Sequence, residues 1–459
     1  MRNRFQINAS ALQRPAPRMP RRFRNRGWAL LGAGLACSWA GLAGAQTLRL
    51  GPFDMTLAGR VDFAYDSNVD GSYPAEARDD VVQDDFYWMP SLTLQSSSVA
   101  MQPSTTMSLS SGIAYQDYLR RNELDTMLYF AGVNIQRSHP RLTLSGVGRI
   151  DYSVDSMEDQ YRPGGITRDP TLTQTANGAA VWNYRRLSLN AGANFTRERH
   201  DFEEYQIADK DETSYQAGAR FAAFSWGSLF YTWERTMTTM IMTGEETDDT
   251  SESFGVSGAI PLELLRRPQV TYSFGYSREQ KVTEDSTDDT GWEMTHTVTV
   301  SDQIEFSKTT RLTGTASWVN DVTPDDEDQI TFQYNLNLSQ QLGPRAQHAL
   351  TFTHEPRPTF GSTVDTETRT YGYSLGIRDV FVYGLTFSYG VTYDESTPLT
   401  RGSLTEKTLS HNTGLSHSRQ FSRKLSRTLS YQYTWEDSNF QSGDPMEKHL
   451  VVYGLSYVF

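Results

Sequence analysis

Downstream of about residue 55 the chain alternates between apolar and small polar positions. In 381–391, aromatic or aliphatic residues occupy every odd position, and Gly, Ser or Thr occupies most even ones. The same alternation recurs in 187–195, 330–339 and, with few exceptions, 425–435. A period of two indicates β-strands that bury one face only. No helical periodicity is detected.

Twenty such strands are expected, with boundary errors of a few residues and a possible range of eighteen to twenty-two. They lie near 55–65, 85–97, 105–116, 124–135, 141–152, 171–182, 187–196, 213–224, 228–239, 252–262, 269–279, 292–306, 311–319, 329–340, 347–355, 369–378, 381–393, 405–417, 425–435 and 449–459.

One-sided burial is compatible with a membrane barrel and with a secreted β-sandwich or solenoid. In lipid every backbone polar group must be paired, so strands cross only as a closed barrel, with roughly 9–11 tilted residues each. The segments have about this length. Several apolar faces also end in residues typical of headgroup level, namely Tyr65, Tyr115, Tyr276, Tyr393 and Trp435. The pattern therefore favours an all-β fold, a transmembrane antiparallel up-and-down β-barrel.

The connections between the expected strands alternate in length and charge. Short turns occur at 137–140, 184–186, 307–308 and 343–345, and longer acidic loops at 66–84, 153–170, 197–212, 241–251, 280–291, 320–328, 356–368, 394–404 and 436–448. The loops contain Asp79, Asp80, Asp84, Asp248, Asp249, Asp288, Asp289, Asp325, Asp326 and Asp328, whereas the turns contain Arg266, Arg267, Arg419 and Arg423. This alternation predicts outward-facing loops and two periplasmic termini.

The N-terminal segment has the pattern of a secretory signal peptide. Residues 1–26 contain eight Arg and no acid, and 28–44 are apolar or small and end in Ala43-Gly44-Ala45. We expect cleavage after residue 45, which leaves 46–459 as one outer-membrane barrel domain. Translation from Met1 or from Met19 fits this interpretation, and an uncleaved anchor is the alternative. Without its leader the chain contains no cysteine.

Two stretches carry a resemblance to a known class. The alternating Val451, Tyr453, Leu455, Tyr457 and Phe459 resemble the C-terminal recognition strand of Gram-negative outer-membrane proteins. The resemblance implies that Tyr457 and Phe459 are the signal read by the barrel-assembly machinery. Residues 65–69, Tyr-Asp-Ser-Asn-Val, resemble the opening stretch of porin-like barrels, some of them associated with exopolysaccharide systems. The likeness to outer-membrane barrels covers 46–459 and names no substrate.

The small polar positions predict the lining of a water-filled lumen. Most are neutral: Ser108, Ser110, Gln116, Thr143, Ser145, Ser188, Asn190, Asn194, Gln216, Thr271, Ser273, Thr295, Thr297, Thr299, Gln333, Asn335 and Asn337. The charged pore-lining candidates are Arg60, Asp62, Arg149, Asp151, Arg220, Glu234 and Glu293, with Glu279, Glu305 and Arg311. This mixture favours small hydrophilic solutes or neutral glycans over a polyanion. Residues 154–165 are long enough to fold inward, although a surface loop is the simpler interpretation.

Other site chemistry is weakly indicated. His411, Asn412, Thr413, His417 and Ser418 form a His/Ser cluster that a barrel hydrolase would need, but both His residues alternate with Leu as wall residues do. Asp66, Asn68 and Asp70 follow a calcium-loop spacing, yet Ala77 stands where the bidentate Glu belongs. We therefore expect no cofactor, no resident metal and no catalytic residue.

Composition excludes one partner class and leaves others open. Removing the leader shifts the formal charge from −13 to −21, which disfavours nucleic-acid binding. We expect a porin-like channel of the bacterial outer membrane, with membrane lipid and lipopolysaccharide as its surroundings. The alternatives are an exopolysaccharide export conduit, a structural or adhesive barrel, and a hydrolase. The solute, its direction and the oligomeric state are not determined by the sequence.

Overall fold

The computed structural model describes residues 48–69, 84–96, 99–102, 104–158, 166–200, 209–259, 268–283, 287–289, 292–322, 329–358, 365–398, 404–439 and 444–459. These residues belong to one compact unit, Thr47–Phe459. The expected signal peptide, residues 1–45, lies outside them.

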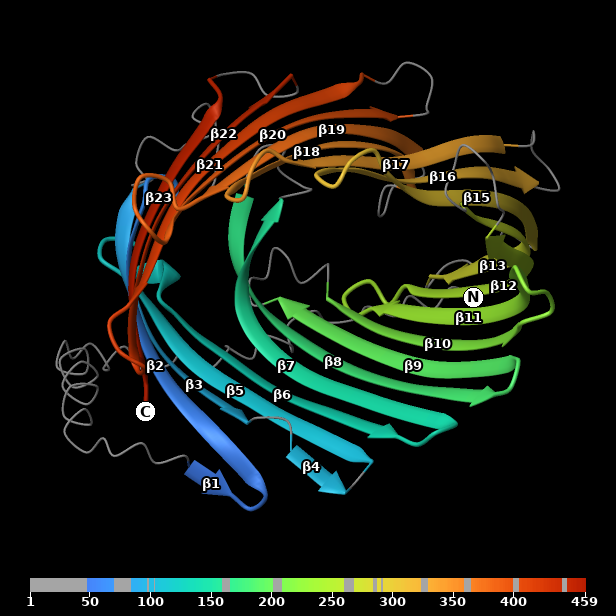
Figure 1. Cartoon of the computed structure of the whole chain (residues 1–459), viewed down its shortest axis with the longest axis horizontal. Helices are drawn as coiled ribbons and strands as arrows, with labels where there is room; N and C mark the ends of the chain where they lie inside the picture. The colour runs from blue at the N-terminus through green and yellow to red at the C-terminus, as the bar shows by residue number, and fades with distance from the viewer. Residues whose placement is uncertain are drawn as a thin grey trace, which may run out of the picture. The chain divides into compact units, whose positions relative to one another are not determined.

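The unit is one antiparallel sheet that closes into a barrel of twenty strands (Figure 1). The wall strands are β2 (Phe53–Asp66), β3 (Asp85–Ser96), β5 (Thr105–Tyr118), β6 (Thr126–Ser138), β7 (Leu142–Glu158), β8 (Ile166–Tyr184), β9 (Leu187–His200), β10 (Lys210–Phe221), β11 (Gly227–Met240), β12 (Glu246–Ala259), β13 (Gln269–Val282), β15 (Glu293–Glu305), β16 (Thr310–Val322), β17 (Gln329–Gln341), β18 (Ala346–Pro358), β19 (Asp365–Arg378), β20 (Leu385–Pro398), β21 (Glu406–Gln420), β22 (Leu425–Ser438) and β23 (Met446–Val458). Three short strands, β1 (Leu48–Leu50), β4 (Val99–Gln102) and β14 (Thr287–Asp289), pair with β2, β5 and β13.

Closure is made by the first and last wall strands. β2 pairs with β23 from Ala58↔Val458 to Asp66↔Leu450, and every other wall strand pairs with its neighbours in the sequence. The expected fold class, an antiparallel up-and-down barrel, and the expected strand number are therefore confirmed. Among the described residues, no helix is long and apolar enough to cross a membrane.

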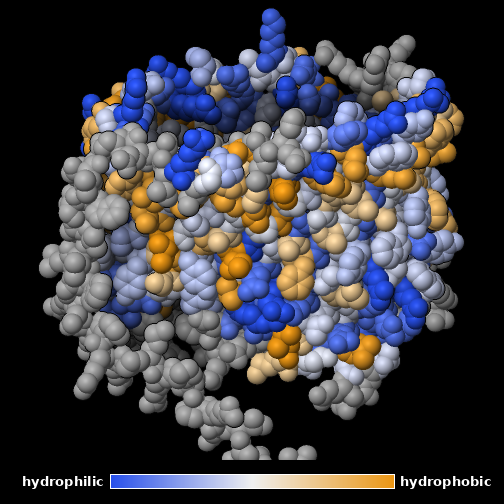
Figure 2. Space-filling model, turned by 90° about the horizontal axis from the view of Figure 1, so that it is seen from below, coloured by the Kyte–Doolittle hydropathy of each residue, from blue (hydrophilic) through white to orange (hydrophobic). Residues whose placement is uncertain are grey.

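The strand registers assign every wall residue to one of two faces, because directly opposed residues in an antiparallel pair share a face. The register runs from Tyr453 to Phe63 and Trp88 and continues around the wall. It gives one face that is rich in aromatic and aliphatic residues, termed the apolar face, and one of small polar residues, termed the polar face. Large side chains of the apolar face are solvent-exposed, as with Phe63 at 52%, and Figure 2 shows apolar residues on the outer wall. The polar face is therefore the inner one.

The barrel has two different rims. The loop rim is the end at which β2 finishes and β3 starts, and the turn rim is the end at which β2 starts and β23 finishes. Turn-rim connections include the two-residue turn Arg185–Arg186 between β8 and β9, in which Arg185 has a φ of 53°. The expected short turns at 184–186, 307–308 and 343–345 lie at this rim.

Several expected loops are shorter than the sequence indicated. β7 continues to Glu158 and β8 starts at Ile166, so 153–158 and 166–170 are strand rather than loop. In the same way β10 starts at Lys210 and β12 at Glu246, which places Asp248 and Asp249 in a strand. Asp288 and Asp289 lie in β14. Charged residues interrupt the alternating sequence in these segments, while backbone pairing continues.

Two assignments at the turn rim were also wrong. β20 starts at Leu385 rather than 381, because Asp379, Phe381 and Gly384 have positive φ angles and the Gly384 amide donates to Asp379 Oδ1 at 2.7 Å. The alternation of Phe381 and Tyr383 thus continues through a turn. Arg419 belongs to β21 and not to a turn. Arg266 and Arg267 lie outside the described residues.

Aromatic residues of the apolar face contact one another across neighbouring strands. Ring contacts connect Tyr334 to Phe352, Phe352 to Tyr371 and Tyr371 to Tyr393, with centroid distances of 5.2, 4.6 and 6.0 Å. Three Tyr hydroxyls lie within hydrogen-bond distance of a His on the neighbouring strand, in the pairs Tyr272–His296, Tyr389–His411 and Tyr431–His449. Such a band is typical of the headgroup level of a bilayer.

Candidate pore lining

The polar face contains every residue that the sequence assigned to the lumen. Registers place Arg60 and Asp62 of β2, Arg149 and Asp151 of β7, Arg220 of β10, Glu234 of β11 and Glu293 of β15 on it. The neutral Ser, Thr, Asn and Gln positions share this face around the wall. A continuous inner surface of hydroxyl and amide groups can exchange hydrogen bonds with water or with a hydrophilic solute.

An ion pair lies on the polar face of β2, where this strand pairs with β23. Arg60 donates from Nε to both carboxylate oxygens of Asp62 at 2.8 Å, and the Asp62 side chain is 5% exposed. Gly454 of β23 makes this packing possible, because a Cβ there would lie 2.4 Å from Asp62 Oδ1 and 3.1 Å from Arg60 Nη2. Sequence reasoning placed both charges but gave no signal for the glycine opposite them.

A second buried acid lies on the same seam near the loop rim. Asp66 is fully buried, and its carboxylate accepts from the Asn68 amide at 3.0 Å and pairs with Lys448 Nζ at 3.1 Å. Asp66 and Asn68 belong to the weak calcium-loop candidate, and Asp70 lies outside the described residues. The Asp66 carboxylate thus helps to join β2 to β23 through its ion pair with Lys448. Lys448 was not singled out from the sequence.

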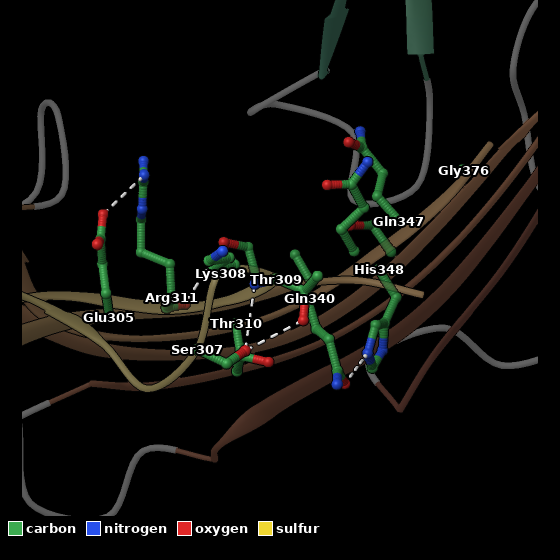
Figure 3. A pocket seen from close by; sticks show the side chains of 14 residues that line it. Glu305, Ser307, Lys308, Thr309, Thr310, Arg311, Gln340, Gln347, His348 and Gly376 are labelled. Atoms are coloured by element: carbon green, nitrogen blue, oxygen red, sulfur yellow. Dashed lines mark hydrogen bonds and ion pairs between the residues drawn. The ribbon is translucent and has the colours of Figure 1, made fainter. Parts of the chain in front are cut away.

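Other charged lining residues are also paired. Arg149 donates to Asp151 two positions along β7. Arg311 of β16 pairs with Glu305 of β15 at 3.1 Å, beside a hollow of about 430 Å³ that Gln347 and Ser339 help to line. Figure 3 shows Glu305 and Arg311 extending from one side of the strands, while the hydrogen-bonded Gln340 and His348 extend from the other. Opposite charges therefore neutralise each other within each of these two pairs.

Acids accumulate on the polar face towards the loop rim. Asp249 of β12 lies directly opposite Glu279 of β13. On β9 and β10, Glu198 and Glu212 are each 3.8 Å from Lys210 Nζ, so two carboxylates share one ammonium. On the apolar face of β11 and β12, charged residues such as Arg235 and Asp248 take the place of aromatic ones at this end. Burial, followed by the charges of Glu279 and Asp248, raises the pKa of Asp249.

The β7–β8 hairpin rises beyond its neighbours. The last β6–β7 pair is Tyr129↔Tyr152 and the β8–β9 pairing starts at Thr171↔His200, whereas β7 and β8 stay paired to Glu158↔Ile166. In Figure 1 the ends of both strands leave the ring and lie within its outline. Residues 159–165, in the segment considered for inward folding, lie outside the described residues.

The His/Ser cluster of β21 is divided between the two faces. His411, Thr413 and His417 lie on the apolar face, and Asn412 and Ser418 on the polar face. The His411 ring contacts Trp435 at 5.2 Å and its Nδ1 lies 3.0 Å from the Tyr389 hydroxyl. The arrangement does not assemble a nucleophile, a base and an orienting group at one point.

The C-terminal residues complete the closure. Tyr457 lies opposite Gly59 and Leu425, and the Phe459 amide donates to the Leu57 carbonyl at 2.9 Å. The Phe459 ring packs over Gly59, where a Cβ would lie 3.3 Å from it, and meets the Tyr457 ring edge-on at 5.0 Å. The side chains proposed as an assembly signal thus sit at the seam.

No protein-family model matches the chain, and no curated protein matches it. Solved structures with a similar arrangement include Pseudomonas aeruginosa OccK5 (OpdH), at 10% identity and a TM-score of 0.38 over 88% of this chain and 98% of that one. Acinetobacter baumannii OccAB3 matches at 10% identity and 0.39, over 88% and 100%. Pseudomonas aeruginosa OccK2 (OpdF) matches at 12% and 0.40, over 88% and 98%.

Proposed function

We propose that the protein is a passive channel of the bacterial outer membrane that admits small hydrophilic solutes. The observation that carries this proposal is the closed twenty-strand barrel with an apolar outer face and a polar inner face. A barrel of this strand number encloses more space than its own side chains fill, as in 16–18-stranded porins. Water therefore occupies the lumen.

The lining supports weak rather than stringent selection. Rings of one charge select ions by sign, whereas Arg60, Arg149 and Arg311 each stand beside an acid on the same face. Acids such as Asp249 and Glu279 near the loop rim give that mouth a negative potential. Small neutral solutes, including neutral glycans, fit this lining better than polyanions, and small cations are mildly favoured over anions.

The two rims support an orientation. We place the turn rim, with Phe459 and the start of β2, in the periplasm and the loop rim outside, because outer-membrane barrels have short periplasmic turns and longer external loops. Within this arrangement the β7–β8 hairpin narrows the external mouth.

Planar-bilayer recording tests the proposal. Purified protein with β-rich circular dichroism should give a stable conductance with a mild preference for K⁺ over Cl⁻. The preference should weaken at 1 M salt, where the Debye length is about 3 Å. Deleting residues 155–165 should increase the conductance if the hairpin narrows the mouth. Repeated insertions of folded protein without conductance would overturn the channel assignment.

Liposome swelling identifies the solute class. Vesicles that contain the protein should swell in small neutral sugars faster than in an anionic sugar of the same size. Equal rates would show that lining charge contributes nothing to selection, and swelling only in the anionic sugar would contradict the assignment.

A further inference from the structure

Two arginines of the apolar face lie directly opposite each other at the turn rim. Arg419 of β21 and Arg427 of β22 are register partners, one position from the end of β21 and two positions from the start of β22. Like charges directly opposed on neighbouring strands are unfavourable unless something neutralises them. Among the described residues, neither guanidinium has a carboxylate within ion-pair distance.

The pair is organised by an aromatic ring instead of by an acid. The guanidinium carbons of Arg419 and Arg427 lie 5.7 and 5.4 Å from the centroid of Phe421, in the turn that connects the two strands. Arg427 Nε is buried and has no hydrogen-bond partner. A buried donor without a partner is rare in folded proteins, so the protein satisfies the Arg427 guanidinium incompletely.

The surface around Arg419 and Arg427 combines cationic and aliphatic side chains. On the apolar face Arg427 lies opposite Leu455 of β23, and Leu429 follows two positions along β22, 47% exposed. Leu415, opposite Tyr431, continues the exposed apolar surface on β21. Lys424 adds a third cation at the rim, with its Nζ 5.9 Å from the centroid of Tyr457. Cations thus lie at the edge and aliphatic side chains extend from them towards the strand centres.

The loop rim shows the contrasting arrangement. There the arginines of the apolar face meet carboxylates, as in Arg197–Asp211 and Arg235–Asp248. At the turn rim a second cluster repeats the aromatic organisation, since Arg141 and Arg185 lie 5.0 and 5.4 Å from the centroid of Tyr184. At the turn rim these four arginines therefore pack on aromatic rings rather than on acids.

We propose that Arg419 and Arg427 bind the phosphate of an anionic glycerophospholipid whose acyl chains lie along Leu429 and Leu415. A guanidinium fork matches phosphate oxygens in a bidentate manner, and two opposed guanidinium groups can bind one phosphate from both strands. The adjoining exposed aliphatic surface favours a lipid over free phosphate, which would leave it uncovered. The proposal rests on the membrane placement given above but not on the conduction of solutes.

Native mass spectrometry of detergent-purified, delipidated protein tests this site with dioleoyl phosphatidylglycerol as the probe. Wild-type protein should retain bound phosphatidylglycerol, and the R419Q/R427Q double variant should retain at least about tenfold less. R137Q is the matched control, because Arg137 is also an apolar-face arginine near the turn rim but lies opposite Thr105 and Leu144. It should bind as wild type does.

Further arms separate lipid from other sources of phosphate. Phosphatidylcholine should bind more weakly than phosphatidylglycerol, and millimolar inorganic phosphate should not displace the lipid. Equal retention by the double variant, or full displacement by inorganic phosphate, would overturn the proposal. R427K keeps the charge but loses the fork and should bind at an intermediate level, which a purely structural role would not produce.

Folding and conduction are checked separately. Each variant should show the heat-modifiable migration of a closed barrel before its lipid binding is compared. A variant that conducts normally but loses phosphatidylglycerol supports the lipid site independently of the channel. Bound lipid on a protein that never conducts would contradict the channel alone.

Discussion

The guanidinium of Arg235 on β11 donates two hydrogen bonds to the carboxylate of Asp248 on β12, with Nε–Oδ1 and Nη2–Oδ2 distances of 3.0 and 2.6 Å. The pair lies on the apolar face, where Arg235 is two residues beyond Trp233 along β11. Arg197–Asp211 and Lys407–Glu395 occupy equivalent positions on other hairpins. Cross-strand charge pairs therefore take over from aromatic packing where the strands pass beyond the apolar band.

Removing this pair should loosen the hairpin end and leave the barrel closed. We expect D248N to increase amide exchange in residues 240–246 severalfold, measured by hydrogen–deuterium exchange. E252Q is the control, because Glu252 lies on the same face opposite Trp233 and has no ion-pair partner among the described residues. The hydrogen bond from Arg235 lowers the pKa of Asp248, so the wild-type protection should persist to pH values below the usual carboxyl range. Equal exchange in D248N and wild type would contradict this role.

The sequence was sufficient for the strands and their faces because a hairpin barrel is local. Each wall strand pairs with its neighbour in the chain, so strict alternation in segments such as 330–339 identifies both the strand and its apolar face. The same reasoning placed Arg60 and Asp62 on one face, since residues two apart in a strand share a face.

The alternation did not predict several strand ends, one turn and two residues at the seam, because these features depend on backbone pairing or on contacts between distant segments. The strand ends at Lys210 and Glu246 are charged on both faces, so they appeared as loops. The turn at 379–384 kept an alternating sequence although its backbone reverses. Gly454 makes room for Asp62, and Lys448 pairs with Asp66, only because β23 lies against β2. The two strands are nearly four hundred residues apart in the chain, so no local pattern predicts these contacts.

Filling the space above Gly454 should disturb the seam. G454V would push a side chain against Asp62 and Arg60, and overpacking of this kind costs about 1–3 kcal/mol. We expect less heat-modifiable barrel and a lower unfolding midpoint in urea. G178A is the control, because no atom lies within 4 Å of a Cβ at that strand glycine. A G454V barrel as stable as G178A would show that the Arg60–Asp62 packing is not needed.

A charge on the outer wall should be far more costly than the same charge on the lining. Leu336 lies on the apolar face of β17 and is 38% exposed, whereas Asn335 is on the polar face. L336R should lower the free energy of unfolding in lipid vesicles by about 2–4 kcal/mol if it lies near mid-bilayer. N335R should be close to wild type. The reverse order would mean that the two faces are assigned the wrong way round.

Loss of the C-terminal ring should impair assembly without blocking export. Deleting Phe459, or F459S, removes the ring that covers Gly59 next to the β2–β23 seam. We expect the variant to accumulate as unfolded protein in the periplasm, measured by fractionation and heat-modifiable migration. Y383S changes an aromatic residue that is 88% exposed at the same rim and should assemble normally. Wild-type amounts of folded F459S in the outer membrane would refute the assembly-signal interpretation.

Ion selectivity should depend on pH through the acids of the loop-rim mouth. Asp249 faces Glu279 on β13 and Thr236 on β11, and Lys281, the nearby cation, pairs with Glu245 at 2.6 Å. Burial and the Glu279 charge raise the pKa of Asp249, so this carboxyl takes up a proton at a higher pH than an ordinary Asp, whose pKa is about 3.9. As pH falls from 7, the mouth therefore loses negative charge early. The preference for K⁺ over Cl⁻, measured as a reversal potential across a salt gradient, should decline before the ordinary carboxyl range is reached.

D249N should show a smaller preference at pH 7 and a flatter pH profile. D211N removes one acid from the apolar face, where Asp211 pairs with Arg197 and Arg199, and should keep the wild-type profile. A D249N profile that coincides with wild type at every pH would exclude Asp249 from the selective mouth.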